Sequence, residues 1–157
     1  MLKFLKTRDI YTVANRGLLL MEGLTLVLTL FGILSHLFWG KSLDLVSPLG
    51  LFKPGSSLVM IGLILNLLVA VLVAIGLIKN MRAPIKRNLA NYLPYNLAMV
   101  WAVLGLIVDL ILGLNYQASL YLGQILVFLL ASLAAQEYNS REKRMRRHNY
   151  IRGLILR

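Results

Sequence analysis

Residues 21–36 of the chain read MEGLTLVLTLFGILSH, an apolar run of helical length. The polar and small residues in it follow one another at steps of three, four, three and four: Glu22, Thr25, Thr29, Gly32 and His36. Successive residues of an α-helix are rotated by about 100°, so these five residues fit within an arc of about 80°. Ser35 is the one polar side chain of this run that lies off the stripe. The pattern predicts a helix with one face turned toward protein or water.

The whole chain is unusually apolar. Hydrophobic residues make up 59% of its 157 residues, and the mean hydropathy is +0.74. Four long apolar stretches cover residues 17–39, 57–78, 95–114 and 118–135, and each is close to the ~20 residues that an α-helix needs to cross a bilayer. We therefore predict an all-α integral membrane protein with four transmembrane helices. The first stretch is too long for the apolar part of a cleaved signal peptide, so we expect it to remain.

Basic residues are concentrated on one side of the predicted membrane. The net charge is +11, and fifteen of the 17 Lys and Arg residues lie before the first span, between spans two and three, or after span four. Only Lys41 and Lys53 lie on the opposite side. The positive-inside rule then places both termini in the cytoplasm, as an even number of spans also requires. We expect a multi-pass protein of the cytoplasmic (inner) membrane, with Tyr11, Tyr92, Tyr95 and Tyr138 at the inner boundary, where aromatic side chains are enriched.

Three segments are expected along the chain. Residues 1–16 form a basic amphipathic segment, either a short helix in the headgroup region or a frayed terminus. Residues 17–136 form the transmembrane domain, in which 79–94 is a basic inner loop. Residues 137–157 form a basic cytoplasmic tail, into which the fourth helix extends until Gly153 ends it.

Small residues recur at helical spacing in every predicted span. Because such residues let helix backbones approach closely in a membrane, we expect them to lie at helix contacts, within the bundle or with another subunit. The packing residues so predicted are Gly32, Gly62, Ala70, Ala74, Ala98, Ala102, Gly105, Gly113 and Gly123.

Polar side chains within the spans should face protein or a hydrated cavity, because hydrocarbon offers them no hydrogen bonds. Counting along the spans at about 1.5 Å per residue places His36, Asp109 and Gln124 in one layer near the outer face. By the same count Asn66 lies near the midplane and Glu22 near the inner face. An ionised carboxylate at such a depth costs at least ~2.5 kcal/mol. We therefore expect His36 or Gln124 to partner Asp109, and Arg16 or a basic loop residue to partner Glu22.

Two interpretations of these polar residues remain open. In one, Glu22, Thr25, Thr29, Asn66, Asp109, His36 and Gln124 form hydrogen bonds between helices or with a partner subunit. In the other, Glu22, Asn66, Asp109 and His36 form a track that carries protons or ions through a small oligomeric channel or transporter. Haem ligation by His36 would need Met60 as the second ligand, because the other histidine lies in the tail; we expect no cofactor.

The sequence contains few groups suited to catalysis. It has no cysteine, no HExxH, GxSxG or P-loop motif, and no hydrophilic domain large enough for a soluble active site. We assign no catalytic residue and no metal site. An intramembrane lipid-modifying enzyme built on Asp109, His36 and Gln124 is a further alternative.

Basic residues of the inner loop and tail are predicted to contact anionic headgroups or a cytoplasmic partner. They are Arg82, Lys86, Arg87, Arg144, Arg146 and Arg147. Nucleic acid is not expected, because no recognition motif is present and the tail offers only Tyr138 and Tyr150 for stacking. The sequence thus predicts a non-catalytic subunit that packs, as a homo- or hetero-oligomer, into a larger membrane complex.

Overall fold

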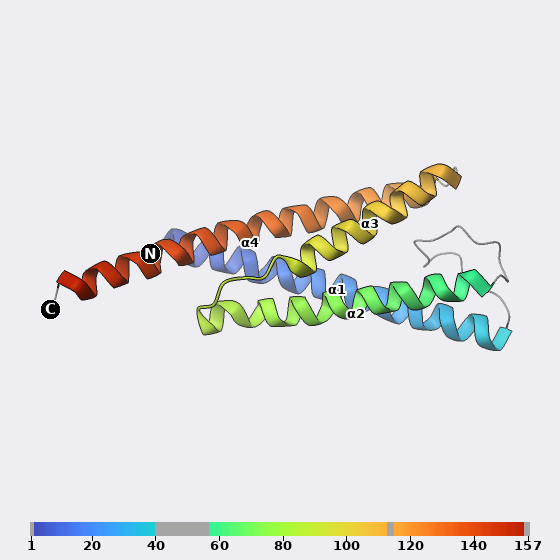
Figure 1. Cartoon of the computed structure of the whole chain (residues 1–157), viewed down its shortest axis with the longest axis horizontal. Coiled ribbons are helices and arrows are strands. Elements are labelled where there is room, and N and C mark those ends of the chain that lie inside the picture. The colour runs from blue at the N-terminus through green and yellow to red at the C-terminus, as the bar shows by residue number, and fades with distance from the viewer. Residues whose placement is uncertain (1, 40–56, 113–114, 156–157) are drawn as a thin grey trace.

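The computed structural model describes residues 2–39, 57–112 and 115–155, and these form four α-helices without a strand. Helix α1 covers Leu2–Trp39 and α2 covers Ser57–Lys86. Helix α3 covers Leu93–Leu112 and α4 covers Asn115–Ile155 (Figure 1). The all-α prediction is confirmed for this part of the chain, whereas the predicted outer loop between the first two spans lies outside it.

Three of the four helices are long and apolar enough to span a membrane. The stretches that qualify are Thr7–Trp39 in α1, Met60–Lys86 in α2 and Leu120–Tyr150 in α4. Helix α3 contains the shorter apolar stretch Leu93–Val108. The structure therefore has the composition of a membrane-embedded helical protein.

The helices extend beyond the apolar runs that predict them. Helix α1 includes the basic N-terminal segment from Leu2 on, so this segment is helical and continuous with the first apolar stretch. Helix α2 continues through Pro84 to Lys86, although a loop was expected from residue 79. Helix α4 passes through Gly153, so the prediction that this glycine ends the helix is wrong. A single glycine inside a helix costs only about 1 kcal/mol relative to alanine, which neighbouring helical residues can offset.

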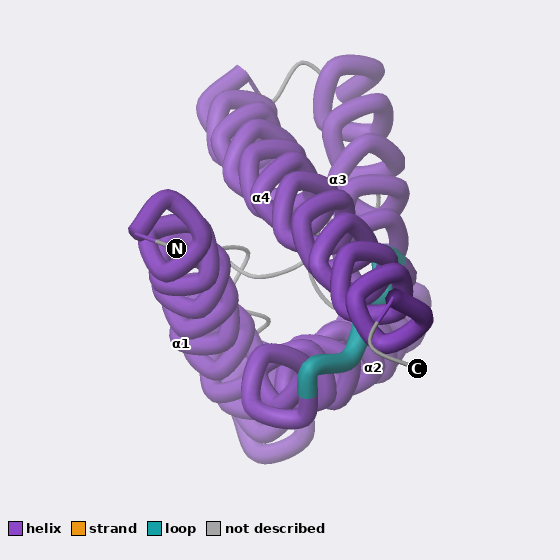
Figure 2. The backbone as a smooth tube through the Cα atoms, turned by 90° about the vertical axis from the view of Figure 1, so that its left-hand side faces the viewer, coloured by secondary structure: helices purple, strands orange, loops and turns teal. Residues whose placement is uncertain are grey.

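The helices are arranged as a ring in which consecutive helices contact each other and α4 closes the ring against α1. Helix α1 packs against α2 and α4, and α3 packs against α4 and α2. The backbones of the diagonal pairs, α1 with α3 and α2 with α4, do not approach each other closely over the described residues. Figure 2 shows this ring from one end. In Figure 1 the α1–α2 pair and the α3–α4 pair lie closest at one end and separate toward the other.

The main cluster of buried apolar side chains lies toward the end where the two pairs converge. It joins residues from all four helices: Tyr11, Leu18, Val73, Leu77, Ala90, Tyr95, Ala98, Phe128, Ala131, Ala135 and Tyr138. Farther along, close contacts within the pairs include those between Gly32 and the Leu63 side chain and between Gly105 and the Tyr121 ring. The four helices are therefore held together chiefly at this one end.

Gly76 allows α2 and α3 to approach. A Cβ atom placed on Gly76 would lie 2.7 Å from the Cβ of Pro94, which sits in the first turn of α3 and cannot rotate away. The packing residues predicted on α2 did not include this glycine. On α1, by contrast, a Cβ atom on Gly23 would have no atom within 4 Å apart from its chain neighbours and the backbone of its own helix.

We expect Gly76→Ala to destabilise the protein by about 1–3 kcal/mol, because the added methyl group forces α2 and α3 apart. Gly23→Ala adds the same group in open space and should leave stability unchanged or raise it by up to ~1 kcal/mol through helix propensity. Thermal unfolding of the two purified variants in one detergent measures the difference. Equal shifts in the two variants would contradict the close approach at Gly76.

Candidate functional site

The described basic segments meet at the converging end of the bundle. Hydrogen bonds join the start of α1 to the end of α2, and the turn that precedes α3 to the later part of α4. The first residues of α1 and α3 and the last residues of α2 thus lie together with the basic stretch of α4. We call this end the basic end.

The turn between α2 and α3, residues 87–92, is held by two asparagine side chains from neighbouring helices. Asn80 of α2 accepts a hydrogen bond from the Asn91 N–H at 2.8 Å and donates one to the Asn91 carbonyl at 2.7 Å. Asn139 of α4 pairs in the same way with the N–H and carbonyl of Ala90, at 2.6 and 2.9 Å. Each amide therefore gives one residue of the turn both an acceptor for its N–H and a donor for its carbonyl. We call Asn80 and Asn139 the asparagine latch.

Further side chains satisfy the first part of the same turn. The Tyr138 hydroxyl donates to the Asn88 carbonyl at 3.0 Å, and the Arg146 guanidinium donates to the Arg87 carbonyl. Arg87 has a φ of 51°, and the Asn88 N–H bonds back to the Ala83 carbonyl at 2.9 Å. This is the pattern of a left-handed cap at the C-terminus of a helix. Arg146 therefore stabilises the end of α2, although the sequence suggested only a role toward headgroups or a partner.

Tyr11 explains how α2 tolerates a proline in its last turns. Pro84 lacks the N–H that would bond the carbonyl four residues earlier, which belongs to Asn80. The Tyr11 hydroxyl donates to that carbonyl at 3.2 Å, so α1 supplies the donor that the proline lacks. The Tyr11 ring also stacks on Tyr138 of α4, with ring centroids 4.7 Å apart.

Tyr95 ties α3 to α1 and α2 beside the latch. Its hydroxyl donates to the Asn15 Oδ1 at 2.6 Å and accepts from the Asn80 Nδ2 at 3.2 Å. Asn15, Asn80 and Tyr95 are all at least 95% buried. The four tyrosines predicted at one boundary do lie at this end. The asparagines were missed, although Asn and Tyr are adjacent at five places in the sequence, three of them at this end of the bundle, at 91–92, 95–96 and 138–139.

A second polar contact joins three helices in the middle of the bundle. The Asn66 Nδ2 donates to the Thr29 hydroxyl at 2.8 Å, and the Trp101 indole N–H donates to the Asn66 Oδ1 at 2.9 Å. The Thr25 hydroxyl donates to the Met21 carbonyl of its own helix at 3.1 Å. Of the predicted polar residues, Thr25, Thr29 and Asn66 thus form hydrogen bonds inside the chain.

Glu22 differs from these residues because it is buried without a polar partner. Only 7% of it is exposed, and no hydrogen bond or ion pair links its carboxyl group to another side chain in the described part of the chain. The expected pairing with Arg16 is absent, since Arg16 is exposed on another face of α1. The carboxyl group must therefore be protonated, hydrated or matched by a ligand.

The predicted outer layer is only partly described. The Nδ1 atom of His36 is buried and has no hydrogen-bond partner among the described residues, and Gln124 is half-buried. The side chain of Asp109 lies outside the described part of the chain, so its pairing with His36 or Gln124 stays a prediction. The haem interpretation of His36 also stays untested. Among the described residues, no group of three His, Cys, Asp or Glu side chains is placed to hold a metal ion.

Most of the predicted packing residues face other helices of the same chain. Those that are buried are Gly32, Gly62, Ala70, Ala74, Ala98, Ala102 and Gly105. Gly123 is exposed, and a Cβ atom there would meet nothing within 4 Å; Gly113 lies outside the described residues. The small residues therefore build the bundle, and Gly123 alone of the described ones faces outward.

The end of α4 projects from the bundle as an exposed basic helix. Every residue from Lys143 to Tyr150 is exposed, and Figure 1 shows this part of α4 extending past the other helices. We call residues 143–150 the α4 arm. Arg144 and Arg147 lie on it, whereas Arg82 and Lys86 are exposed on α2.

No protein-family model matches the chain, and no curated protein or solved structure shows detectable similarity to it.

We expect Asn139→Ala to lower the free energy of unfolding by about 2 kcal/mol, because the N–H and carbonyl of Ala90 lose their partner while buried. Asn149→Ala removes the same side chain from an exposed position on the α4 arm and serves as the matched control. Thermal unfolding in detergent compares the two variants. The latch has no structural role if Asn139→Ala unfolds at the same temperature as Asn149→Ala.

Proposed function

We propose that this protein is a non-catalytic subunit of a larger complex in the cytoplasmic (inner) membrane. In this proposal all four helices cross the bilayer, both termini lie in the cytoplasm, and the basic end faces anionic lipid headgroups. The α4 arm reaches an acidic surface on another component of the complex.

The arrangement of the helices supports this orientation. The beginnings of α1 and α3 and the last residues of α2 share the basic end, so neighbouring helices run in opposite directions. The 20 residues of α3 extend about 30 Å, which equals the thickness of the hydrocarbon core. A single crossing by each helix brings every described basic segment to one side, as the positive-inside rule requires.

The α4 arm is the observation that carries the proposed role. Helix α4 has 41 residues and a length of about 60 Å, roughly twice what a crossing needs. Tyr138, Asn139 and Arg146 fix it to α1 and to the turn before α3. The arm is thus a rigid extension with a fixed direction, and it presents Arg144, Arg147 and the 71% exposed Tyr150. Arginine and tyrosine are enriched at protein interfaces.

The interior of the bundle supports a structural role for most of its polar residues. Asn66 bonds to Thr29 and Trp101, and thereby fixes three helices relative to one another. The residues proposed for a track across the membrane are thus partly engaged in holding the bundle. This use of polar residues is typical of helix association in membranes.

We expect the double variant Arg144→Glu and Arg147→Glu to lose its partner, because the two reversals give the arm the same sign of charge as an acidic surface. Lys79→Glu with Lys86→Glu makes the same charge change on exposed residues of α2 and is the control. Native gel electrophoresis of gently solubilised membranes measures the mass of the complex. A complex of unchanged mass in the arm variant would overturn the role of the arm, and wild type migrating as a single chain would overturn the proposal itself.

The second candidate function, passage of protons or ions, is favoured by one observation, the buried and unpartnered carboxyl group of Glu22. A buried acid of this kind is frequent where protons or cations cross a bundle.

Proton flux into liposomes separates the two functions. With a structural role, wild-type vesicles conduct no more than protein-free vesicles under an imposed membrane potential. Flux that Glu22→Gln abolishes would instead establish the second candidate, provided that Glu137→Gln retains it. Glu137 is the matched control, because this acid is exposed and pairs with Arg141 at 2.6 Å.

A further inference from the structure

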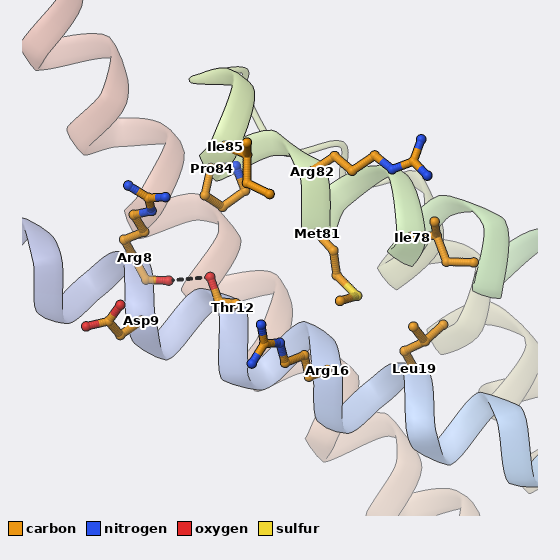
Figure 3. Close-up of a pocket in the computed structure, with 10 residues that line it drawn as sticks. All are labelled: Arg8, Asp9, Thr12, Arg16, Leu19, Ile78, Met81, Arg82, Pro84 and Ile85. Atoms are coloured by element: carbon orange, nitrogen blue, oxygen red, sulfur yellow. Dashed lines mark hydrogen bonds between the residues drawn. The ribbon is translucent and has the colours of Figure 1, made fainter.

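A groove of about 510 Å³ lies between α1 and α2 at the basic end. Three arginines line it, Arg8 and Arg16 from α1 and Arg82 from α2, together with the apolar residues Leu19, Ile78 and Met81 (Figure 3). The groove thus combines a cationic part with an apolar part. Of its three arginines, only Arg82 belongs to the basic residues predicted from the sequence to contact headgroups or a partner.

The positive charge of the groove arginines is available to a ligand. Residues 8, 12 and 16 are spaced by one helical turn each and so share one face of α1. In Figure 3 the Arg8 side chain extends toward the last turns of α2, the Arg16 side chain lies along α1, and the Arg82 guanidinium extends away from α1. Among the described side chains no carboxylate forms an ion pair with any of the three. Asp9 is the one acid that lines the groove. The groove therefore keeps an excess of positive charge.

The donors that face a ligand belong to the guanidinium groups. The Thr12 hydroxyl already donates to the Arg8 carbonyl at 2.8 Å, so its proton is engaged within α1. Guanidinium groups bind phosphate oxygens through paired N–H donors, which makes arginine the preferred partner of phosphate groups. The cationic part of the groove is thus suited to a phosphate.

The apolar part of the groove continues along α2 toward the middle of the helix. Val71, Ile75, Ile78, Arg82 and Ile85 follow one another at steps of four, three, four and three, so they share one face. All five are exposed, the aliphatic ones by 40, 45, 42 and 76% in chain order. An apolar strip therefore leads from the arginines into the membrane-spanning part of α2.

We infer that this groove is a binding site for an anionic phospholipid of the leaflet at the basic end. The headgroup phosphate lies at the mouth of the groove beside Arg8 and Arg16, with the positive charge of Arg82 on the α2 side, and an acyl chain lies along Val71 and Ile75. The site deepens the proposed function and rests on its placement of the basic end at a membrane surface. It differs from diffuse attraction between basic residues and the leaflet, because it joins a phosphate position to an acyl-chain path on one helix pair.

The test compares phospholipid binding by purified full-length variants in detergent, measured by native mass spectrometry. The probes are dioleoyl phosphatidylglycerol and dioleoyl phosphatidylcholine. The groove variant Arg16→Gln with Arg82→Gln should bind phosphatidylglycerol at least about tenfold more weakly than wild type, because each basic residue near a headgroup contributes about 1 kcal/mol. The control Arg144→Gln with Arg147→Gln removes the same charge from the α4 arm and should bind as wild type does. Both variants must unfold at the wild-type temperature, as substitutions of exposed residues allow.

Three results would overturn the site. Equal losses in the groove and control variants would mean that the charge acts diffusely. Equal binding of the two lipids by wild type would mean that the headgroup charge is not recognised. Displacement of the lipid by an equal concentration of glycerol 3-phosphate would identify a soluble phosphate as the ligand. None of these results changes the mass of the native complex, so the proposed function is judged separately.

Discussion

The structure depends on satisfying the backbone of a non-helical turn at the edge of an apolar bundle. A turn cannot bond its own N–H and carbonyl groups as a helix does, and a nearby bilayer offers no substitute within its hydrocarbon core. Asn80 and Asn139 each supply one donor and one acceptor to a single residue of the turn. Because these amides come from α2 and α4, the bonds that complete the turn also fix both helices. The Tyr11 hydroxyl and the Arg146 guanidinium likewise donate to the carbonyls of Asn80 and Arg87 and so join further helices.

The sequence predicts the helices well because apolar length and charge placement are local properties. It predicts helix ends poorly, and α2 shows why. Pro84 reads as a breaker, yet α2 continues past it because Tyr11, far away in the sequence, bonds the carbonyl that the proline leaves free. Glu22 was expected to find Arg16, but Arg16 belongs to another face of α1. Of the candidate sites, the stripe of helix one could be predicted from spacing, whereas the latch and the groove arise from contacts between helices that no local pattern reveals.

The polar residues of the chain fall into two sets according to their contacts. Asn66, Thr29 and Trp101 satisfy one another across three helices, as the asparagines and tyrosines do at the basic end, and these contacts hold the bundle. Charged groups without such partners lie elsewhere: Arg144 and Arg147 on the α4 arm, and the arginines of the groove between α1 and α2. Contact with lipid or another protein is expected of the second set. Glu22 and the Nδ1 atom of His36 are the exceptions, since both are buried and no described side chain satisfies them.

The stacked pair Tyr11 and Tyr138 bears on the order in which the protein is assembled during synthesis. The two rings are separated by most of the chain, so α1 is synthesised long before its stacking partner leaves the ribosome. Until then, water must bond the N–H and carbonyl of Ala90, which Asn139 bonds in the folded protein. Packing of α4 is therefore the step that removes water from this turn, and a nascent chain halted before it would leave the backbone groups of the turn hydrated.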